Sequence, residues 1–433
     1  MKKLAVAVSA AFALAVHAGT PAGAPVSITN IAVDASNVHL TWEAPLGKSA
    51  NDLKLYESTN LLDNTWTEVT NNITKSVGDA TVASDVPVKF FRLYAAAPDN
   101  NGGYDFTYWF AIDHTIMIDL DTWDVTRLAR DYNVTNDLLS TTTHLYMRHV
   151  TNNVSGKIGS ASDEFGHSSN ETLVNPKTLN NGYYIGVYPV TRGQWAKVMG
   201  TAAPSTANEA KPQVGNGTST GLDAMCYAGI RSLNRSNGSN VTYTVGADVG
   251  GSFMERLNYH VRLNNPDLNI GGNTIGFDLP TEAQWEIACR AGTTGSYNDN
   301  NDVVLTTDGT NTELIAALEA RLRLLGWFSG NNTTEGFASG TKPVGLKIPN
   351  LAGMYDFHGN VYEWCLDAYN ATNTSGDGPM TADTASAFRP VRGGDYGSTA
   401  SSCRSAYRSY NNAGYSFGNI GFRLRASGAV VSE

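Results

Sequence analysis

Residues 392–425 read RGGDYGSTASSCRSAYRSYNNAGYSFGNIGFRLR. The part from Asp395 to Asn419 contains no Lys, Glu, Gln, Met, Trp, Leu, Val or Ile. Such a set offers too little aliphatic surface for a core strand or helix. Tyr supplies large, stiff contact area, and Ser, Gly and Asn supply adaptable hydrogen bonds, which is typical of binding loops. The composition therefore predicts a binding loop, with an ordinary irregular surface loop as the alternative.

The whole chain has 433 residues, a formal net charge of −10 and 43 glycines. The length favours two or three domains. The negative charge argues against nucleic acid and anionic membrane as partners. Helix-period segments are few, so we expect a loop-rich protein that contains strands.

The N-terminus has the pattern of an export signal. Lys2 and Lys3 precede a short apolar run, Leu4–Val16, and a small-residue cleavage site follows. This pattern predicts a signal peptide at residues 1–18. The apolar run is too short to span a bilayer comfortably, so we expect no membrane insertion. The mature protein is expected in the periplasm, at the cell surface or secreted.

Four cysteines, Cys226, Cys289, Cys365 and Cys403, occur in the chain. An even number in an exported protein favours disulfides, with buried free thiols as the alternative. We expect at least one bond, with Cys365–Cys403 as the first choice, because it would pin a loop that has little core of its own.

Residues 25–97 contain alternating segments at 38–42, 53–56 and 89–94, with turn residues between them. Short strands at such intervals predict a small all-β sandwich. The pattern weakly resembles fibronectin type III modules. Residues 98–103 are expected to be a linker to a second domain, residues 104–433.

The second domain carries clear local signals. Apolar, β-rich segments at 108–120, 145–148 and 183–188 predict strands. Two capping boxes, Thr191 to Gln194 and Thr281 to Gln284, predict helix starts. Leucines spaced for one buried face predict a further helix at 312–325.

A candidate cation loop lies at residues 349–364, PNLAGMYDFHGNVYEW. Asp356, Asn360 and Glu363 place three oxygen-bearing side chains close together, and Gly359 permits a tight turn. Ca²⁺ prefers such oxygen ligands. The alternative is a turn in which Asp and Asn bind their own backbone.

Four motifs, YYIGVYPVTRGQWAKVMG, LPTEAQWEIACRAG, PNLAGMYDFHGNVYEWCLD and RGGDYGSTASSCRSAYR, are followed by IGFRLR. Together they resemble the formylglycine-generating enzyme, or sulfatase-modifying factor, family, in that family's order and over residues 140–427. The resemblance implies an α+β domain with a variant of the C-type lectin fold. It also implies structural Ca²⁺ held by the Asp356 and Glu363 side chains and the Gly359 and Val361 carbonyls.

Activity in that family needs two cysteines after Arg-Gly-Gly that bind Cu(I). The matching positions here are Ser398 and Cys403. Soft thiolates select Cu(I), and a serine hydroxyl does not replace one. We therefore expect neither copper nor formylglycine production, although an oxidase acting on a sulfatase cysteine, or another enzyme on this scaffold, remains the alternative. No P-loop occurs in the sequence.

The favoured function is binding of a protein or glycan partner. The stretch after Asp395 also resembles the hypervariable segments that a diversity-generating retroelement produces in proteins of the lectin fold. The expected binding residues are Tyr396, Ser398, Tyr407, Tyr410 and Tyr415.

Overall fold

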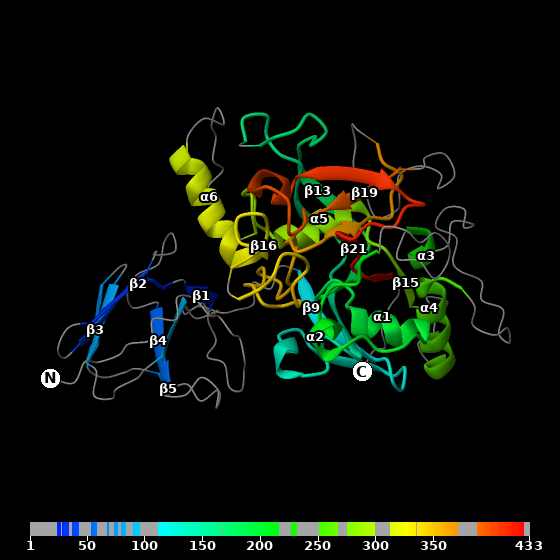
Figure 1. Ribbon diagram of the computed structural model, residues 1–433, viewed down its shortest axis with the longest axis horizontal. Coiled ribbons are helices and arrows are strands. Elements are labelled where there is room, and N and C mark those ends of the chain that lie inside the picture. Colours follow the sequence, from blue (N-terminus) through cyan, green and yellow to red (C-terminus); the bar gives the residue numbers. More distant parts are fainter. Residues whose placement is uncertain are drawn as a thin grey trace. The chain divides into compact units, whose positions relative to one another are not determined.

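The computed structural model describes residues 111–164, 166–215, 227–231, 251–266, 275–298, 312–334, 336–370 and 388–427, together with strands between residues 24 and 95. The chain divides into two compact units, Met1–Tyr108 and Trp109–Glu433 (Figure 1). The predicted signal peptide at 1–18, the linker at 98–103 and Cys226 lie outside the described residues.

The first unit contains two four-stranded antiparallel sheets, ordered β1-β8-β4-β5 and β2-β3-β7-β6. Its strands are β1 (Ala24–Val26), β2 (Ile28–Val33), β3 (Asn37–Trp42), β4 (Leu53–Ser58), β5 (Thr67–Glu68), β6 (Ile73–Ser76), β7 (Asp79–Ala83) and β8 (Phe90–Ala95). The three alternating segments predicted β3, β4 and β8. An all-β unit therefore precedes the second unit, as expected.

The second unit is built on a six-stranded antiparallel sheet, ordered β10-β9-β11-β14-β22-β15. Its strands are β9 (Ile112–Asp119), β10 (Val125–Ala129), β11 (His144–Val150), β14 (Tyr183–Gly186), β15 (Gly276–Asp278) and β22 (Arg425–Ser427). The strand at the C-terminal end of this unit, β22, pairs between β14 and β15. The sheet thus joins both sequence ends of the unit, and the strands predicted at 108–120, 145–148 and 183–188 are present.

A second sheet of four strands has the order β20-β19-β18-β21, with β18 (Tyr362–Trp364), β19 (Phe388–Arg392), β20 (Arg408–Asn412) and β21 (Ile420–Gly421). Two further ladders join β12 (Val154–Ile158) to β13 (Val174–Leu179) and β16 (Gly326–Trp327) to β17 (His358–Gly359). Residues 395–419, where we expected no core strand or helix, contain the strand β20 at the edge of this sheet and the short 3-10 helix η4 (Ala400–Cys403). An edge strand is held by backbone hydrogen bonds along one side, so β20 needs little aliphatic surface of its own.

Both predicted capping boxes start helices. Thr191 caps α1 (Arg192–Met199) and Thr281 caps α5 (Glu282–Arg290), each with a reciprocal bond from the glutamine three residues on. The predicted helix at 312–325 is α6 (Thr312–Leu325). The remaining helices are α2 (Thr206–Glu209), α3 (Tyr227–Arg231), α4 (Phe253–Asn264) and the 3-10 helix η2 (Val134–Asn136). Mixed helix and sheet make the unit α+β, as predicted.

The largest apolar cluster of the second unit joins the six-stranded sheet to α1, α3 and α4. Trp195 of α1 stacks on Phe253 of α4 with ring centroids 5.2 Å apart, and Phe422 meets both rings edge-on. Figure 1 shows α1 and α4 next to each other. Among the described residues, every helix is too short or too polar to cross a lipid bilayer.

Four arginines of the C-terminal stretch are buried, and each forms an ion pair with a glutamate that lies far away in the sequence. The pairs are Arg392 with Glu286, Arg404 with Glu164 and Glu171, Arg408 with Glu282, and Arg423 with Glu363. The closest contacts are 2.7 Å for Arg404, 2.6 Å for Arg408 and 2.9 Å for Arg423. Part of this polar stretch is therefore buried, and its arginines form ion pairs in the interior of the unit.

We predict that Arg404→Met lowers the free energy of unfolding of the second unit by about 3–5 kcal/mol, because it removes the buried arginine that pairs with Glu171 and leaves Glu164 with Lys157 alone. The matched control is Lys197→Met. Lys197 pairs with Asp121 at the surface, with side chains 43% and 53% exposed, so we expect a loss of about 0–1 kcal/mol. Urea unfolding followed by circular dichroism measures both. Equal losses in the two variants would contradict the central role of the buried pair.

Candidate functional site

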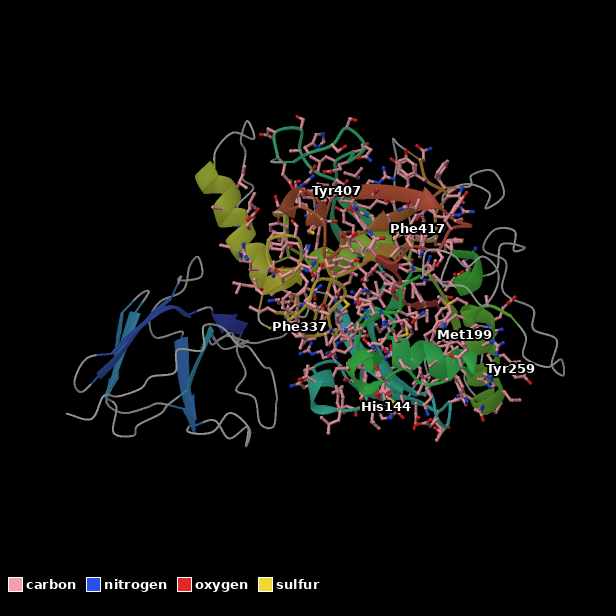
Figure 2. The ribbon with its side chains drawn as sticks, in the orientation of Figure 1. His144, Met199, Tyr259, Phe337, Tyr407 and Phe417 are labelled. Atoms are coloured by element: carbon pink, nitrogen blue, oxygen red, sulfur yellow. The ribbon has the colours of Figure 1, made fainter. Side chains whose placement is uncertain are left out.

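The five residues predicted to bind a partner differ in exposure. Tyr410 and Tyr415 are 48% and 61% exposed, whereas Tyr396, Ser398 and Tyr407 are partly buried. In Figure 2, Tyr407 and Phe417 lie on the side of the unit opposite His144. The structure therefore offers two of the five side chains freely to a partner and the other three only in part.

Tyr410 belongs to an exposed aromatic stack. Its ring lies 4.2 Å from that of Tyr369 and meets Phe388, itself 45% exposed, edge-on at 5.3 Å. Beneath the stack, the Arg408 guanidinium lies 5.4 Å from the Tyr369 ring and binds Glu282 through two hydrogen bonds of 2.8 and 2.6 Å. We call Tyr369, Phe388 and Tyr410 the aromatic patch. Because a buried ion pair fixes its base, the patch is a rigid apolar surface.

Ser398 is engaged within its own turn. Its hydroxyl accepts a hydrogen bond from the Asp395 backbone N–H at 3.0 Å and donates to Asp395 Oδ1 at 3.1 Å. The same carboxylate oxygen accepts from Gly397 N–H at 2.7 Å. These contacts stabilise the turn. The Ser398 hydroxyl is therefore less available for hydrogen bonds to a partner than the sequence suggested.

Cys403, the other position matched to a copper ligand, is fully buried at the end of η4. Burial raises the pKa of its thiol well above the ordinary value, and the nearby Asp395 carboxylate raises it further. The protonated thiol is a poor metal ligand, because copper binds the thiolate. Neither Ser398 nor Cys403 therefore has the chemistry that a Cu(I) pair requires.

The expected Cys365–Cys403 disulfide is wrong, because Cys289, Cys365 and Cys403 are each buried free thiols. Cys365 packs in a cluster with Trp285 and Phe357, whereas Cys403 packs with Tyr297 and Leu318. The loop that the disulfide was expected to pin is held by buried arginines instead.

We predict that thiol reagents do not label these three cysteines in the folded protein, because burial excludes the reagent and raises each thiol pKa, to about 12 for Cys289. After unfolding without a reductant, all three should react. Peptide mapping after alkylation measures this. Recovery of a Cys365–Cys403 cross-linked peptide would contradict it.

The predicted calcium loop places its two carboxylates in different surroundings. Both oxygens of Glu363 accept hydrogen bonds from Arg423, at 2.9 and 3.0 Å, and Oε2 also accepts from Trp285 Nε1 at 2.7 Å. The Gly359 carbonyl accepts from Val361 N–H at 2.8 Å. The Glu363 carboxylate is thus already paired with a guanidinium, and the expected four-ligand calcium site stays a prediction.

Asp356 alone retains the character of a ligand. Its Oδ2 accepts from Gly345 N–H at 2.7 Å, while its buried Oδ1 has no donor among the described residues. Burial raises the pKa of this carboxyl to about 6. Asp356 also has a positive φ of 58°, which asparagine tolerates well.

Calcium in this loop stays a prediction that rests on Asp356. If it binds there, adding it at 100 times its dissociation constant should stabilise the second unit by about 2.7 kcal/mol. Asp356→Asn, which keeps the hydrogen-bond acceptor and suits the backbone, should remove that response. Thermal melting with calcium and with EDTA measures both proteins. An unmutated protein that melts identically in the two buffers would refute the prediction.

A recess of about 300 Å³ opens beside the C-terminal stretch. Tyr396 and Gly418 line it from that stretch, and the surrounding scaffold contributes Arg192, Lys211, Phe337 and Lys342. Sequence reasoning found Tyr396 but missed the three cations, because they come from segments that meet only in the fold. The recess is large enough for a small ligand.

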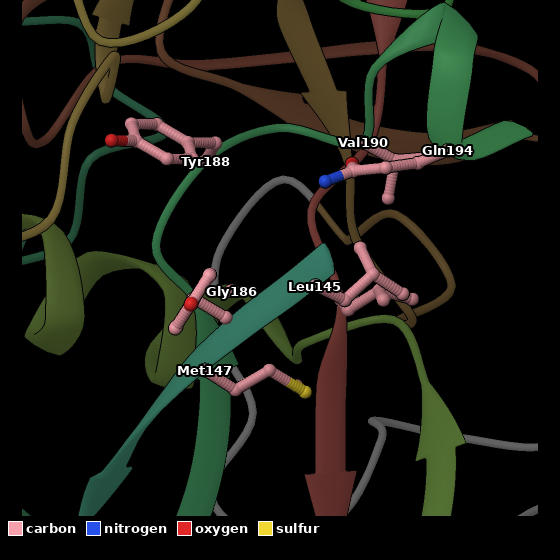
Figure 3. Close-up of a pocket in the computed structure, with 8 residues that line it drawn as sticks. Leu145, Met147, Gly186, Tyr188, Val190 and Gln194 are labelled. Atoms are coloured by element: carbon pink, nitrogen blue, oxygen red, sulfur yellow. The ribbon is translucent and has the colours of Figure 1, made fainter. Parts of the chain in front are cut away.

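A much smaller cavity, of about 10 Å³, lies beside β11 and β14 (Figure 3). Leu145, Met147, Gly186 and Val190 are among its lining residues. This volume suffices for about one water molecule, so the cavity is a packing defect of the core.

One further polar cluster was not foreseen from the sequence. Asp113 Oδ1 lies 2.6 Å from Nδ1 of His114 and 2.7 Å from Nδ1 of His149, on the neighbouring strands β9 and β11. These three ligand-type atoms lie within 4.8 Å of one another, the spacing of a metal site. His114 Nε2 pairs with the Tyr184 hydroxyl at 2.8 Å. Hydrogen bonds account for the arrangement, so we assign it no metal.

Comparison with known proteins identifies the scaffold. The family model described as "Sulfatase-modifying factor enzyme 1-like domain" matches residues 150–427. A formylglycine-generating enzyme of Streptomyces coelicolor is 35% identical over 188 residues, which are 40% of this chain and 55% of that protein. A protein named chaperone protein LppX, of Paenibacillus barcinonensis, is 30% identical over 195 residues, 44% of this chain and 64% of its own. The chain thus spans somewhat more than half the length of these relatives.

Among solved structures, Treponema denticola variable protein 1 is similar, with a TM-score of 0.43 and 24% identity over 68% of this chain and 97% of that one. At this level of identity the likeness concerns the fold alone.

Proposed function

The chain belongs to the sulfatase-modifying factor enzyme 1-like family, and from this premise we propose that it is a binding protein rather than a formylglycine-generating oxidase. A shared fold does not carry activity with it, so the site must decide. The copper positions hold the Ser398 hydroxyl and the buried Cys403 thiol, whose pKa burial raises. That pair lacks the two thiolates that Cu(I) chemistry requires.

The observation that carries the proposal is the aromatic patch on its anchored base. The rings of Tyr369 and Phe388 both contact that of Tyr410, and the Arg408–Glu282 ion pair lies beneath them. Aromatic side chains presented on a rigid frame are typical of binding surfaces, because little conformational entropy is lost on contact. Tyr415, 61% exposed, extends the same kind of surface along the segment.

The partner is a protein or a glycan, met outside the cytoplasm if the predicted signal peptide is used. We further propose that residues 395–419 are varied by a diversity-generating retroelement. A reverse-transcriptase gene and a near-copy of this segment beside the gene would support that origin. If neither the reverse-transcriptase gene nor the near-copy occurs beside this gene or its relatives, the retroelement origin is contradicted, but the binding proposal is not affected.

We predict that Tyr410→Ala with Tyr415→Ala abolishes capture of the partner that the aromatic patch binds, on glycan or peptide arrays, while changing the free energy of unfolding by at most about 1 kcal/mol. Both rings are exposed, so their loss should leave the core intact. The control is Tyr259→Ala on α4, a partly exposed tyrosine outside the segment. It should keep all binding.

Two outcomes would contradict the proposal. One is unfolding of the double variant, which would make the tyrosines part of the core. The other is copper-dependent oxidation of a sulfatase-type cysteine peptide by the unmutated protein, which would establish the oxidase instead.

A further inference from the structure

The recess beside Tyr396 concentrates positive charge in a chain whose net charge is −10. Arg192, Lys211 and Lys342 line it, and none of the described lining residues is acidic. The remaining walls are two aromatic rings, Phe337 and Tyr396, and a polar turn that includes Ser339 and Thr341. Such a lining is complementary to an anion that also carries hydroxyl groups.

Lys342 is the most informative of the three cations, because it is only 1% exposed. Its ammonium donates hydrogen bonds to Asn332 Oδ1 and to the Gly340 carbonyl. It also lies 5.6 Å from the Trp327 ring and 6.0 Å from the Phe337 ring. All these partners are neutral, and within the described part of the chain no carboxylate forms an ion pair with it.

Lys157, the other buried lysine of the described residues, differs from Lys342 because it has a carboxylate partner. It is 8% exposed and pairs with Glu164 at 3.3 Å. A buried charge ordinarily has a counter-ion, because removing an ion from water is costly. At Lys342 that counter-ion is missing from the described residues. Burial lowers the pKa of Lys342, and the nearby positive charge of Lys211 lowers it further.

The two cations at the rim are also available. Arg192 donates one weak hydrogen bond, from Nε to the Pro212 carbonyl at 3.4 Å. No carboxylate of the described residues forms an ion pair with Arg192 or Lys211. Their charges can therefore be turned toward a ligand without breaking an internal pair.

We propose that this recess binds an acidic sugar, with its carboxylate or sulfate group held by Arg192 and Lys211 above Lys342. This inference rests on the proposed binding function and adds to it a ligand class for the recess, whose lining residues are not those of the aromatic patch. The sugar ring packs against Tyr396 and Phe337, and its hydroxyls meet Ser339, Thr341 and the adjoining backbone. A volume of about 300 Å³ lies at the lower end of small-molecule pockets, which suits one or two sugar rings.

The scaffold and the C-terminal stretch contribute different kinds of residue to the recess. The scaffold supplies all three cations, and the C-terminal stretch supplies Tyr396 and Gly418. Changes within residues 395–419 would therefore alter which acidic sugar fits, while the preference for an anion stays fixed.

The test uses calorimetry with the full chain and three matched probes: a galacturonic acid trimer, its methyl ester and galactose 6-sulfate. The ester has the same rings without the charge. We expect the acid to bind at least tenfold more tightly than the ester, and a rise from about 0.1 M to about 1 M salt to weaken it. Comparing the acid with the sulfate shows which anionic group the recess prefers.

Arg192→Gln with Lys211→Gln should lower affinity for the acidic probes at least tenfold and leave the ester unaffected. Lys197→Gln, which removes a charge from α1 outside the recess, is the control and should bind normally. Both variants change partly exposed side chains, so folding should persist, and melting curves check it.

Equal binding of acid and ester, or unchanged binding by the double variant, would overturn the inference. So would hexaglutamate binding as tightly as the galacturonate trimer, because the recess would then recognise charge on a peptide rather than a sugar. These failures differ from failure of the proposed function. If replacing Tyr410 and Tyr415 abolishes partner binding but the unmutated protein does not bind acidic sugars, the protein is still a binding protein, with a different ligand.

Discussion

Buried ion pairs between one C-terminal stretch and three distant segments are the constraint on which the second unit depends. Arg392, Arg404, Arg408 and Arg423 are each paired with glutamates from residues 164–171, from α5 or from β18. Removing one partner would leave a charge in the core at a cost of several kcal/mol. The pairs therefore favour a single arrangement of segments that otherwise share little regular structure.

Local signals in the sequence predicted the local structure well. The capping boxes at Thr191 and Thr281 start helices because each uses only groups within one turn. The motif order predicted the fold class, and composition predicted the exposure of Tyr410 and Tyr415. These properties depend on neighbours in the chain, which a sequence displays directly.

Properties that depend on partners across the fold were missed. Arg404 and Arg408 read as polar loop residues until Glu171 and Glu282 are placed beside them. The ion pair between Glu363 and Arg423 was missed for the same reason, because the two residues lie 60 positions apart in the sequence. The even number of cysteines in a chain expected to be exported also suggested a disulfide at Cys365, yet that thiol packs in an apolar cluster. The recess was missed for the same reason, because its three cations come from segments that are distant in the sequence.

Arg408 and Tyr410 lie on the same short strand. The Arg408 side chain is buried in an ion pair with Glu282, whereas the Tyr410 side chain is exposed to solvent. A gene library could therefore randomise the outward positions of this stretch while keeping its arginines constant. Most members of such a library should still fold, since the interactions that specify the architecture are not among the randomised codons. The domain would then serve as an engineering scaffold for new affinity reagents, much as antibody frameworks do.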